Sequence, residues 1–189
     1  MVAKHIIVTG ASRSGKSEWA EQLLQSRSAG AQICYVAPGK LYVQDTQWKK
    51  RLEQHKIRRP SHWDLIEGIE FSYLPDLLAP NSKYSQAWLL IDSLGSWVAA
   101  GLEYSEQHWL LMQQALLKNL IYRAMPVFLV SEEVGWGVVP PTAVGGTFRD
   151  RLGALTRACA GVCDERWLVC MGQALPLHRL ATSVQGISL

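Results

Sequence analysis

Two glycines, a lysine and a serine near the start of the chain have the spacing G-x-x-x-x-G-K-[ST]. In a loop of this composition the backbone N–H groups curl around phosphate oxygens, the lysine reaches the outer phosphates, and the last hydroxyl can ligate Mg²⁺. A surface turn rich in glycine and serine is the alternative, but it does not explain the apolar run 5–9 directly before the loop. The pattern therefore predicts a site for a nucleoside triphosphate. Its residues are Gly10, Ala11, Ser12, Arg13, Ser14, Gly15, Lys16 and Ser17.

A carboxylate that ends another apolar run is a candidate partner of this loop. Asp92 follows the run 87–91. At the end of a buried strand a carboxylate can hold Mg²⁺ directly or through water, opposite the Ser17 hydroxyl. The alternative is that Asp92 caps a helix that starts near Ser93. We favour the metal role because the phosphate loop already requires a metal partner, and we predict Ser17 and Asp92 as ligands.

His55 is a candidate nucleophile. Trp48, Leu52 and His55 are spaced at i, i+4 and i+7, so they share one helical face. A histidine on an apolar face is more often structural, but a basic cluster follows this one at once. Cations beside a histidine suit polyphosphate binding and favour the neutral imidazole, which is the nucleophilic form. The cations are Lys56, Arg58 and Arg59.

Charged residues also follow a later apolar run, 126–131. Glu132 and Glu133 come directly after it, beside a glycine-rich loop. Arg149 lies farther along and could neutralise charge on a phosphoryl group in the transition state. A surface ion pair between Arg149 and Asp150 explains the same two residues equally well.

Strand and helix patterns alternate along the chain. Apolar runs predict buried strands at 5–9, 32–37, 87–92, 126–131 and 166–170. Helical periodicity opens at Ser17 and recurs at about 45–55, 94–102, 106–123 and 146–160. The stretch that contains Pro75, Pro80 and Asn81 is poorly periodic, so we expect a surface excursion there.

This alternation predicts an α/β fold, a P-loop NTPase-type three-layer sandwich with a mostly parallel central sheet. We expect a single nucleotide-binding domain over residues 1–189. In such sheets ligands bind outside the carboxyl ends of the strands. The rule places the phosphate loop, Pro38-Gly39, Asp92 and Glu132-Glu133 on one rim.

Composition limits the classes of partner that the chain is expected to bind. The chain has 189 residues, of which 48% are hydrophobic and 19% charged, as in a globular domain. A net charge of +3 without long basic runs does not favour nucleic-acid binding. No apolar stretch approaches the roughly 20 residues that span a bilayer. Lys4 precedes a strand instead of a leader segment, and we expect a cytoplasmic protein whose cysteines are reduced. The cysteines are Cys34, Cys159, Cys163 and Cys170.

Besides the phosphate loop, two blocks of the sequence are highly specific: R-x-x-x-H-K with R-P-x-x-W, and E-V-G-W-G-V-V-P. With these blocks the chain resembles the bifunctional adenosylcobinamide kinase/adenosylcobinamide-phosphate guanylyltransferases of cobalamin biosynthesis, over nearly its whole length. The matching segments are 10–17, 51–56, 59–63, 90–94, 133–140 and 148–150.

The resemblance implies two reactions on one chain. A nucleoside triphosphate, ATP or GTP, phosphorylates the aminopropanol hydroxyl of adenosylcobinamide, with Lys16 and Mg²⁺ at the phosphates. The histidine that matches His55 then attacks the α-phosphorus of GTP, and the GMP passes to the substrate's phosphate. The resemblance also implies a small homo-oligomer. The nucleotide contacts carried over outside the phosphate loop are Ala37, Pro38, Gly39, Lys56, Ile57, Arg58, Arg59, Glu67 and Asp92.

The C-terminal half departs from the family pattern. Glu132 stands where the family usually has Asn, Gly146 where it has Arg, and Thr156-Arg157 where it has Asn-Gln. Two alternatives to the bifunctional enzyme therefore stay open. One is a family member with a single activity. The other is a P-loop GTPase or ATPase that acts as a switch or binding module, but a switch has no use for a histidine beside a basic cluster.

Overall fold

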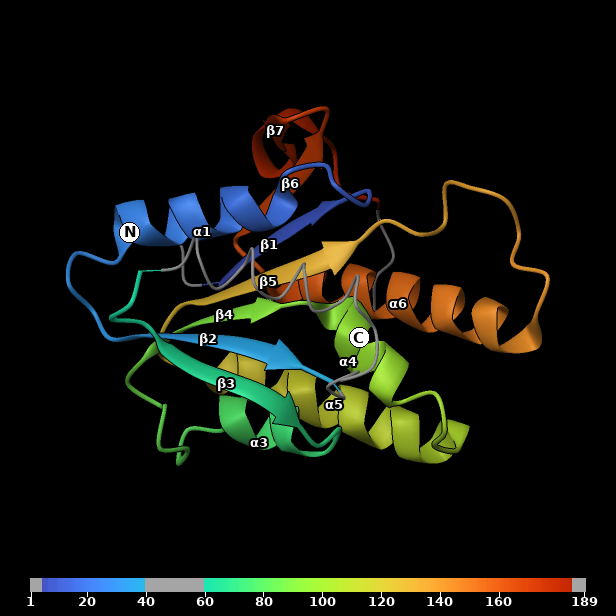
Figure 1. The fold of residues 1–189 in the computed structure, drawn as a ribbon, viewed down its shortest axis with the longest axis horizontal. Helices are drawn as coiled ribbons and strands as arrows, with labels where there is room; N and C mark the ends of the chain where they lie inside the picture. Colours follow the sequence, from blue (N-terminus) through green and yellow to red (C-terminus); the bar gives the residue numbers. More distant parts are fainter. Residues whose placement is uncertain (1–4, 40–59, 185–189) are drawn as a thin grey trace.

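A seven-stranded sheet forms the centre of the computed structural model, which describes residues 5–39 and 60–184 (Figure 1). The strand order is β3-β2-β4-β5-β1-β6-β7, and every neighbouring pair is parallel except the antiparallel β6–β7. The strands are β1 (His5–Gly10), β2 (Ile33–Pro38), β3 (Asp64–Ile69), β4 (Trp88–Asp92), β5 (Val127–Glu132), β6 (Glu165–Cys170) and β7 (Gln173–Pro176). The predicted α/β fold with a mostly parallel sheet is confirmed.

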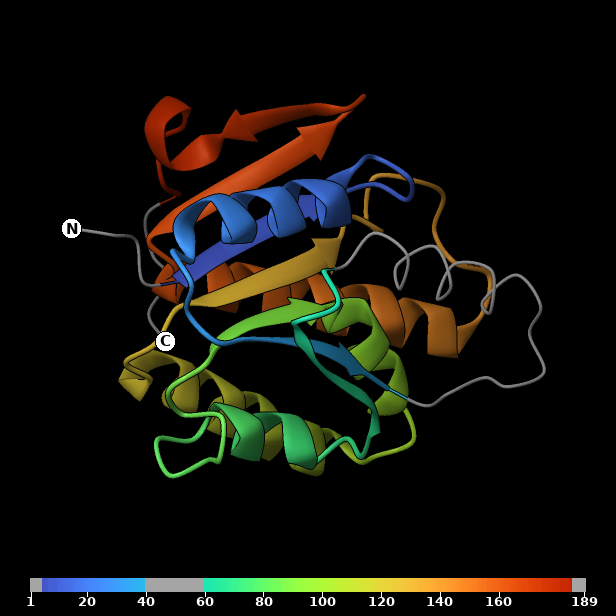
Figure 2. The same cartoon turned by 60° about the vertical axis from the view of Figure 1, so that its left-hand side comes forward.

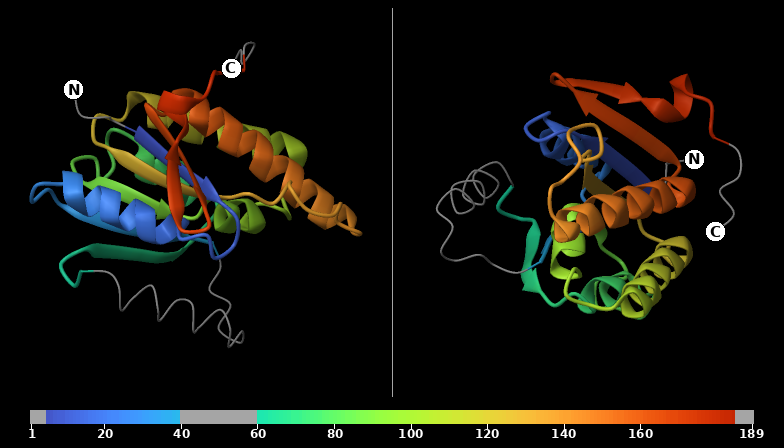
Figure 3. Two further views of the ribbon diagram at one scale, coloured as in Figure 1. Left: turned by 90° about the horizontal axis from the view of Figure 1, so that it is seen from above. Right: turned by 90° about the vertical axis from the view of Figure 1, so that its right-hand side faces the viewer.

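Helices cover both faces of the sheet (Figures 2 and 3). They are α1 (Lys16–Arg27), α3 (Tyr73–Leu78), α4 (Leu94–Ala100), α5 (Glu106–Tyr122), α6 (Ala143–Val162) and α7 (Leu177–Leu180). Helix α1 packs on β1, β4, β5 and β6 from one face, while α4 and α6 pack on the other. Helix α5 packs against α6, and α3 packs against α5. The central strands are therefore buried on both sides, which is why they read as continuous apolar runs.

The stretch around Pro75 is not the irregular excursion that we expected. It contains β3 and α3, and Leu74, Leu77 and Leu78 of α3 are fully buried. Pro75 lies in the first turn of α3, where a missing N–H breaks no helical hydrogen bond. The helix has only six residues and β3 is a largely exposed edge strand, so neither produces a long periodic pattern.

Helix α6 begins earlier than predicted, at Ala143 instead of Gly146, and ends at Val162. Its start is explained by Thr142, whose side chain accepts a hydrogen bond from Gly145 N as an N-cap. The helix predicted at 45–55 lies outside the described residues. None of the helices in the described ranges is both long and apolar enough to cross a membrane.

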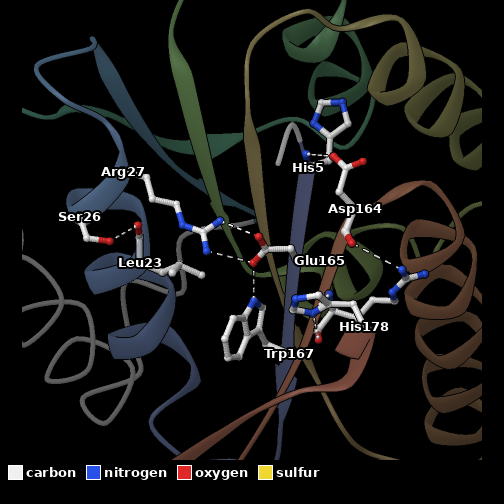
Figure 4. Close-up of polar contacts among 9 residues, drawn as sticks. His5, Leu23, Ser26, Arg27, Asp164, Glu165, Trp167 and His178 are labelled. Carbon is white, nitrogen blue, oxygen red and sulfur yellow. Dashed lines mark hydrogen bonds and ion pairs between the residues drawn. The ribbon is translucent and has the colours of Figure 1, made fainter. Parts of the chain in front are cut away.

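A polar cluster at the amino end of the sheet fixes α1 (Figure 4). Arg27, at the last turn of α1, donates two hydrogen bonds to Glu165 at the start of β6, at 2.9 and 3.1 Å. Trp167 Nε1 donates a third to the same carboxylate. Burial raises the pKa of Glu165, but these donors outweigh it and leave the pKa lowered. The helix is thus held at its far end, opposite the loop that precedes it.

All four cysteines are free, and Cys34, Cys159 and Cys163 are buried. Burial raises the pKa of Cys34 and of Cys159 to about 12, so both thiols stay protonated at neutral pH. They are packing residues of the core between the sheet and helices α3 to α6.

Candidate functional site

The predicted phosphate loop connects β1 to α1 at the carboxyl edge of the sheet. Gly15, the residue before α1, has φ +96°, and a Cβ on Gly10 would lie 2.3 Å from Val169 O of β6. Both positions therefore require glycine, one for its backbone conformation and one for a close approach. The backbone N–H groups of the first turn of α1 remain at the open end of the helix, where an anion is stabilised.

Two side chains of the loop are nearly buried yet poorly satisfied. Ser14 is 8% exposed, and among the described residues its hydroxyl has no hydrogen-bond partner. Lys16 is 9% exposed, and its Nζ donates to Ala11 O at 3.3 Å, so the lysine folds back over its own loop. Buried polar groups are nearly always paired. Phosphate oxygens would supply the missing acceptor to the Ser14 hydroxyl and to Lys16.

Asp92 ends β4 on the same edge, as predicted. Its Oδ2 accepts a hydrogen bond from the Tyr35 hydroxyl at 2.8 Å. The alternative role, a helix cap, belongs to the next residue, because the Ser93 side chain accepts from Ser96 N at the start of α4.

Magnesium fits the donors at this edge. Mg²⁺ prefers hard oxygen ligands and retains several waters and substrate phosphates instead of filling a protein cage. The Ser17 hydroxyl and the Asp92 carboxylate are donors of this kind. Within residues 5–39 and 60–184 there is no cluster of three or more His, Cys, Asp or Glu that could form such a cage.

Glu132 has a structural role that its sequence position did not reveal. It ends β5 opposite Gly10 of β1, and its carboxylate accepts hydrogen bonds from the Ser93 hydroxyl and from Gly95 N. A Cβ on Gly95 would lie 2.2 Å from Glu132 Oε2, so only glycine leaves room for this carboxylate. Burial raises the pKa of Glu132, although the Ser93 hydrogen bond and the charge of Lys16 oppose the change.

Replacing Glu132 with glutamine is expected to make stability less dependent on pH. The folded-state pKa of Glu132 lies above its ordinary value of 4.5, so the stability that its protonated form contributes is lost as pH rises through the folded pKa. Glutamine is isosteric and stays neutral. Urea unfolding at pH 4 to 8 should therefore show Glu132→Gln gaining stability relative to the parent chain as pH increases, whereas Glu70→Gln, at an exposed position, should not. A difference that is constant across this range would contradict the assignment.

The predicted nucleotide contacts on β2 and β3 lie beside one another. Ala37 of β2 pairs with Glu67 of β3, and Pro38 ends β2. Gly39 has φ +109°, and its Cβ position lies 2.8 Å from Ser96 O of α4, which brings this turn against the helix that follows Asp92. The remaining predicted residues are outside the described ranges: His55, Lys56, Ile57, Arg58 and Arg59.

A pocket of about 410 Å³ adjoins the phosphate loop on the α6 side of the sheet. Thr9 Oγ1 donates to Glu133 Oε1 at 2.7 Å on its wall, and the hydroxyls of Ser131 and Thr156 are 2.6 Å apart nearby. The chain segments that line it are the ends of β1 and β5, the loop after β5, α6, β6 and the start of α7. The charged residues among them are Glu132, Glu133, Arg149, Arg157 and Arg166.

Sequence reasoning selected Arg149 but assigned no role to the other residues of α6 at this pocket. Arg149 forms the surface pair with Asp150 that was the alternative explanation, at 3.0 Å. Gly153, Thr156 and Ala160 follow Arg149 at i+4, i+7 and i+11, so one helical face lines the pocket. That periodicity was the signal that could have found them.

Comparison with known proteins identifies a family and relatives that match most of the chain. The family model described as cobinamide kinase / cobinamide phosphate guanyltransferase matches residues 6–177. The chain is 31% identical to the bifunctional adenosylcobalamin biosynthesis protein CobU of Escherichia coli over 180 residues, covering 88% of this chain and 96% of that protein. The CobU protein of Salmonella typhimurium is 32% identical, with the same coverage. The CobP protein of Pseudomonas aeruginosa is 31% identical over 90% of this chain and 95% of its own length.

Among solved structures, a KaiC-like protein of the archaeon Pyrococcus horikoshii superposes with a TM-score of 0.47 at 14% identity, over 87% of this chain and 70% of that one. The sequence matches are much closer and extend over nearly all of each relative. Because of these sequence matches, the chain belongs to the cobinamide kinase / cobinamide phosphate guanyltransferase family.

Proposed function

We propose that this chain phosphorylates the aminopropanol hydroxyl of adenosylcobinamide and then transfers GMP from GTP to the new phosphate, giving adenosyl-GDP-cobinamide. The observation that supports this most strongly is the phosphate loop itself, at the edge where Asp92 ends β4. Its Ser14 hydroxyl is buried with no partner among the described residues, and its Lys16 is nearly buried. We infer the identity of the acceptor, cobinamide, from the family to which the chain belongs.

In the kinase step the loop positions the triphosphate and neutralises its charge. Lys16 exchanges its hydrogen bond to Ala11 O for the outer phosphates, and the N–H groups at the start of α1 bind the inner ones. Ser17 and Asp92 would hold Mg²⁺, which would supply further charge neutralisation. The substrate hydroxyl attacks the γ-phosphorus, the bond to the β-phosphate oxygen breaks, and the nucleoside diphosphate leaves. We propose that either ATP or GTP serves this step.

In the guanylyl step we assign the nucleophile to His55. An imidazole nitrogen attacks the α-phosphorus of GTP, a P–N bond forms, and pyrophosphate leaves. An oxygen of the cobinamide phosphate then attacks the same phosphorus, and the P–N bond breaks to release the histidine. This route divides one displacement between two anions into two easier ones. We further assign nucleotide contacts to Ala37, Pro38, Gly39, Lys56, Ile57, Arg58, Arg59 and Glu67.

We also propose that residues 1–189 form one nucleotide-binding domain, and that it works in the cytoplasm as a small homo-oligomer without a nucleic-acid partner. These assignments rest on the family pattern and on the mild net charge of +3.

Product analysis tests the proposal. Adenosylcobinamide, GTP and Mg²⁺ are incubated with the purified chain, and the corrinoids are identified by mass spectrometry. We expect the monophosphate first and the GDP-linked corrinoid afterwards. Accumulation of the monophosphate alone would indicate that only the kinase is retained. GTP hydrolysis without any modified corrinoid would refute the proposal and favour a switch.

A further inference from the structure

The pocket beside α6 lies next to the start of the phosphate loop. Glu132 and Thr9 line it, and both are next to Gly10, the first residue of the loop: Glu132 pairs with Gly10 in the sheet, and Glu133 N donates to Gly10 O at 3.0 Å. The sequence-predicted nucleotide contacts Ala37 and Glu67 are on β2 and β3, which β4 separates from the pocket-lining strands β5, β1 and β6. Donor and acceptor would therefore meet at the loop from opposite sides.

Among the residues that the structure describes, the charged groups of the pocket include one cation without a partner. Arg149 is paired with Asp150, and Arg166 donates to the carbonyl oxygens of Ala160 and Asp164. In the described part of the chain, Arg157 makes no hydrogen bond and no ion pair, although it lines the pocket. An arginine presents several donors in a planar fork that matches a phosphate group. Arg157 is exposed and is thus free to pair with an anion that enters this pocket.

Size determines which part of the acceptor enters. A pocket of about 410 Å³ accommodates a side chain that carries a phosphate but not a complete substituted macrocycle. At its edge the loop after β5 exposes large apolar residues: Trp136, which also lines the pocket, is 73% exposed and Val138 94%. A flat ring system can pack against such residues outside the pocket.

We propose that this pocket is the acceptor site: it takes the phosphorylated side chain of the corrinoid, Arg157 pairs with that phosphate, and the Trp136 loop contacts the ring. The inference rests on the proposed function, because it assigns the second substrate of the same reaction.

Two variants of α6 test it from independent directions. Arg157→Gln removes the free cation. Gly153→Leu fills the pocket, since a Cβ on Gly153 meets no atom within 4 Å, so the helix accepts the side chain. Matched controls are Lys118→Gln, an exposed cation on α5, and Gly161→Leu, a second glycine of α6 with open space but outside the pocket.

The measurement is steady-state guanylyl transfer with adenosylcobinamide phosphate as the varied substrate. Formation of labelled protein from α-³²P-GTP without acceptor is measured in parallel. We expect both pocket variants to raise the KM for adenosylcobinamide phosphate about tenfold or more. In Arg157→Lys the increase in this KM should be smaller than in Arg157→Gln. Protein labelling should be unchanged in all variants, and the two control variants should keep the KM of the parent chain. An acceptor KM within twofold of the parent chain, with labelling intact, would overturn the pocket assignment. Absence of labelling in the parent chain would overturn the proposed function and this inference with it.

Discussion

Lys16→Ala is expected to slow phosphoryl transfer to adenosylcobinamide by about a thousandfold, as loss of one preorganised charge at a transferring group does. The effect is catalytic because the fold depends little on this side chain: the hydrogen bond described for its Nζ is a 3.3 Å contact with Ala11 O. When a triphosphate is bound, the same ammonium neutralises charge on the outer phosphates, where negative charge is concentrated in the transition state.

The control is Lys118→Ala, which removes an exposed lysine from α5. Initial rates with γ-labelled nucleotide measure the effect, and thermal unfolding verifies that both variants fold. If Lys16→Ala keeps a rate within tenfold of the parent chain, the phosphate loop does not bind the transferred phosphate and the kinase assignment is wrong.

His55→Ala is expected to reduce guanylyl transfer by about 10⁴-fold or more, because it removes the atom that forms the covalent intermediate. The kinase rate should change only a few-fold, since that step uses the phosphate loop and not the histidine. The two activities would thereby be separated on one chain.

His62 provides the matched control, because it is an exposed histidine seven residues after His55 in the sequence. The label left by α-³²P-GTP on the parent chain should be acid-labile and alkali-stable, as a phosphoramidate is. It should persist in His62→Ala and be absent in His55→Ala. If the label persists in His55→Ala and is absent in His62→Ala, the nucleophile is His62 instead of His55.

Local patterns predicted the centre of the fold and much of the rim. Strands buried on both faces must be continuously apolar, so β1, β4 and β5 could be located from the sequence, and parallel pairing places their carboxyl ends together. For the same reason Asp92 and Glu132 were correctly placed on one edge with the phosphate loop.

Tertiary contacts account for what the sequence did not show. The short helix α3 is buried through packing against α5, not through a long periodic pattern. Glu132 reads as an ordinary rim carboxylate until folding brings Ser93 and Gly95 against it. Arg157 is distinguished from the other arginines of the pocket only by tertiary structure, because Arg149 and Arg166 have hydrogen-bond partners there. Such properties depend on residues far apart in the chain.

A transfer experiment with labelled enzyme tests the central claim most directly. The chain is incubated with α-³²P-GTP and Mg²⁺, free nucleotide is removed, and unlabelled adenosylcobinamide phosphate is added. We expect the radioactivity to leave the protein and appear in the GDP-linked corrinoid, with no second addition of GTP. Label that stays on the protein, or is released only as free GMP, would contradict guanylyl transfer through a covalent intermediate.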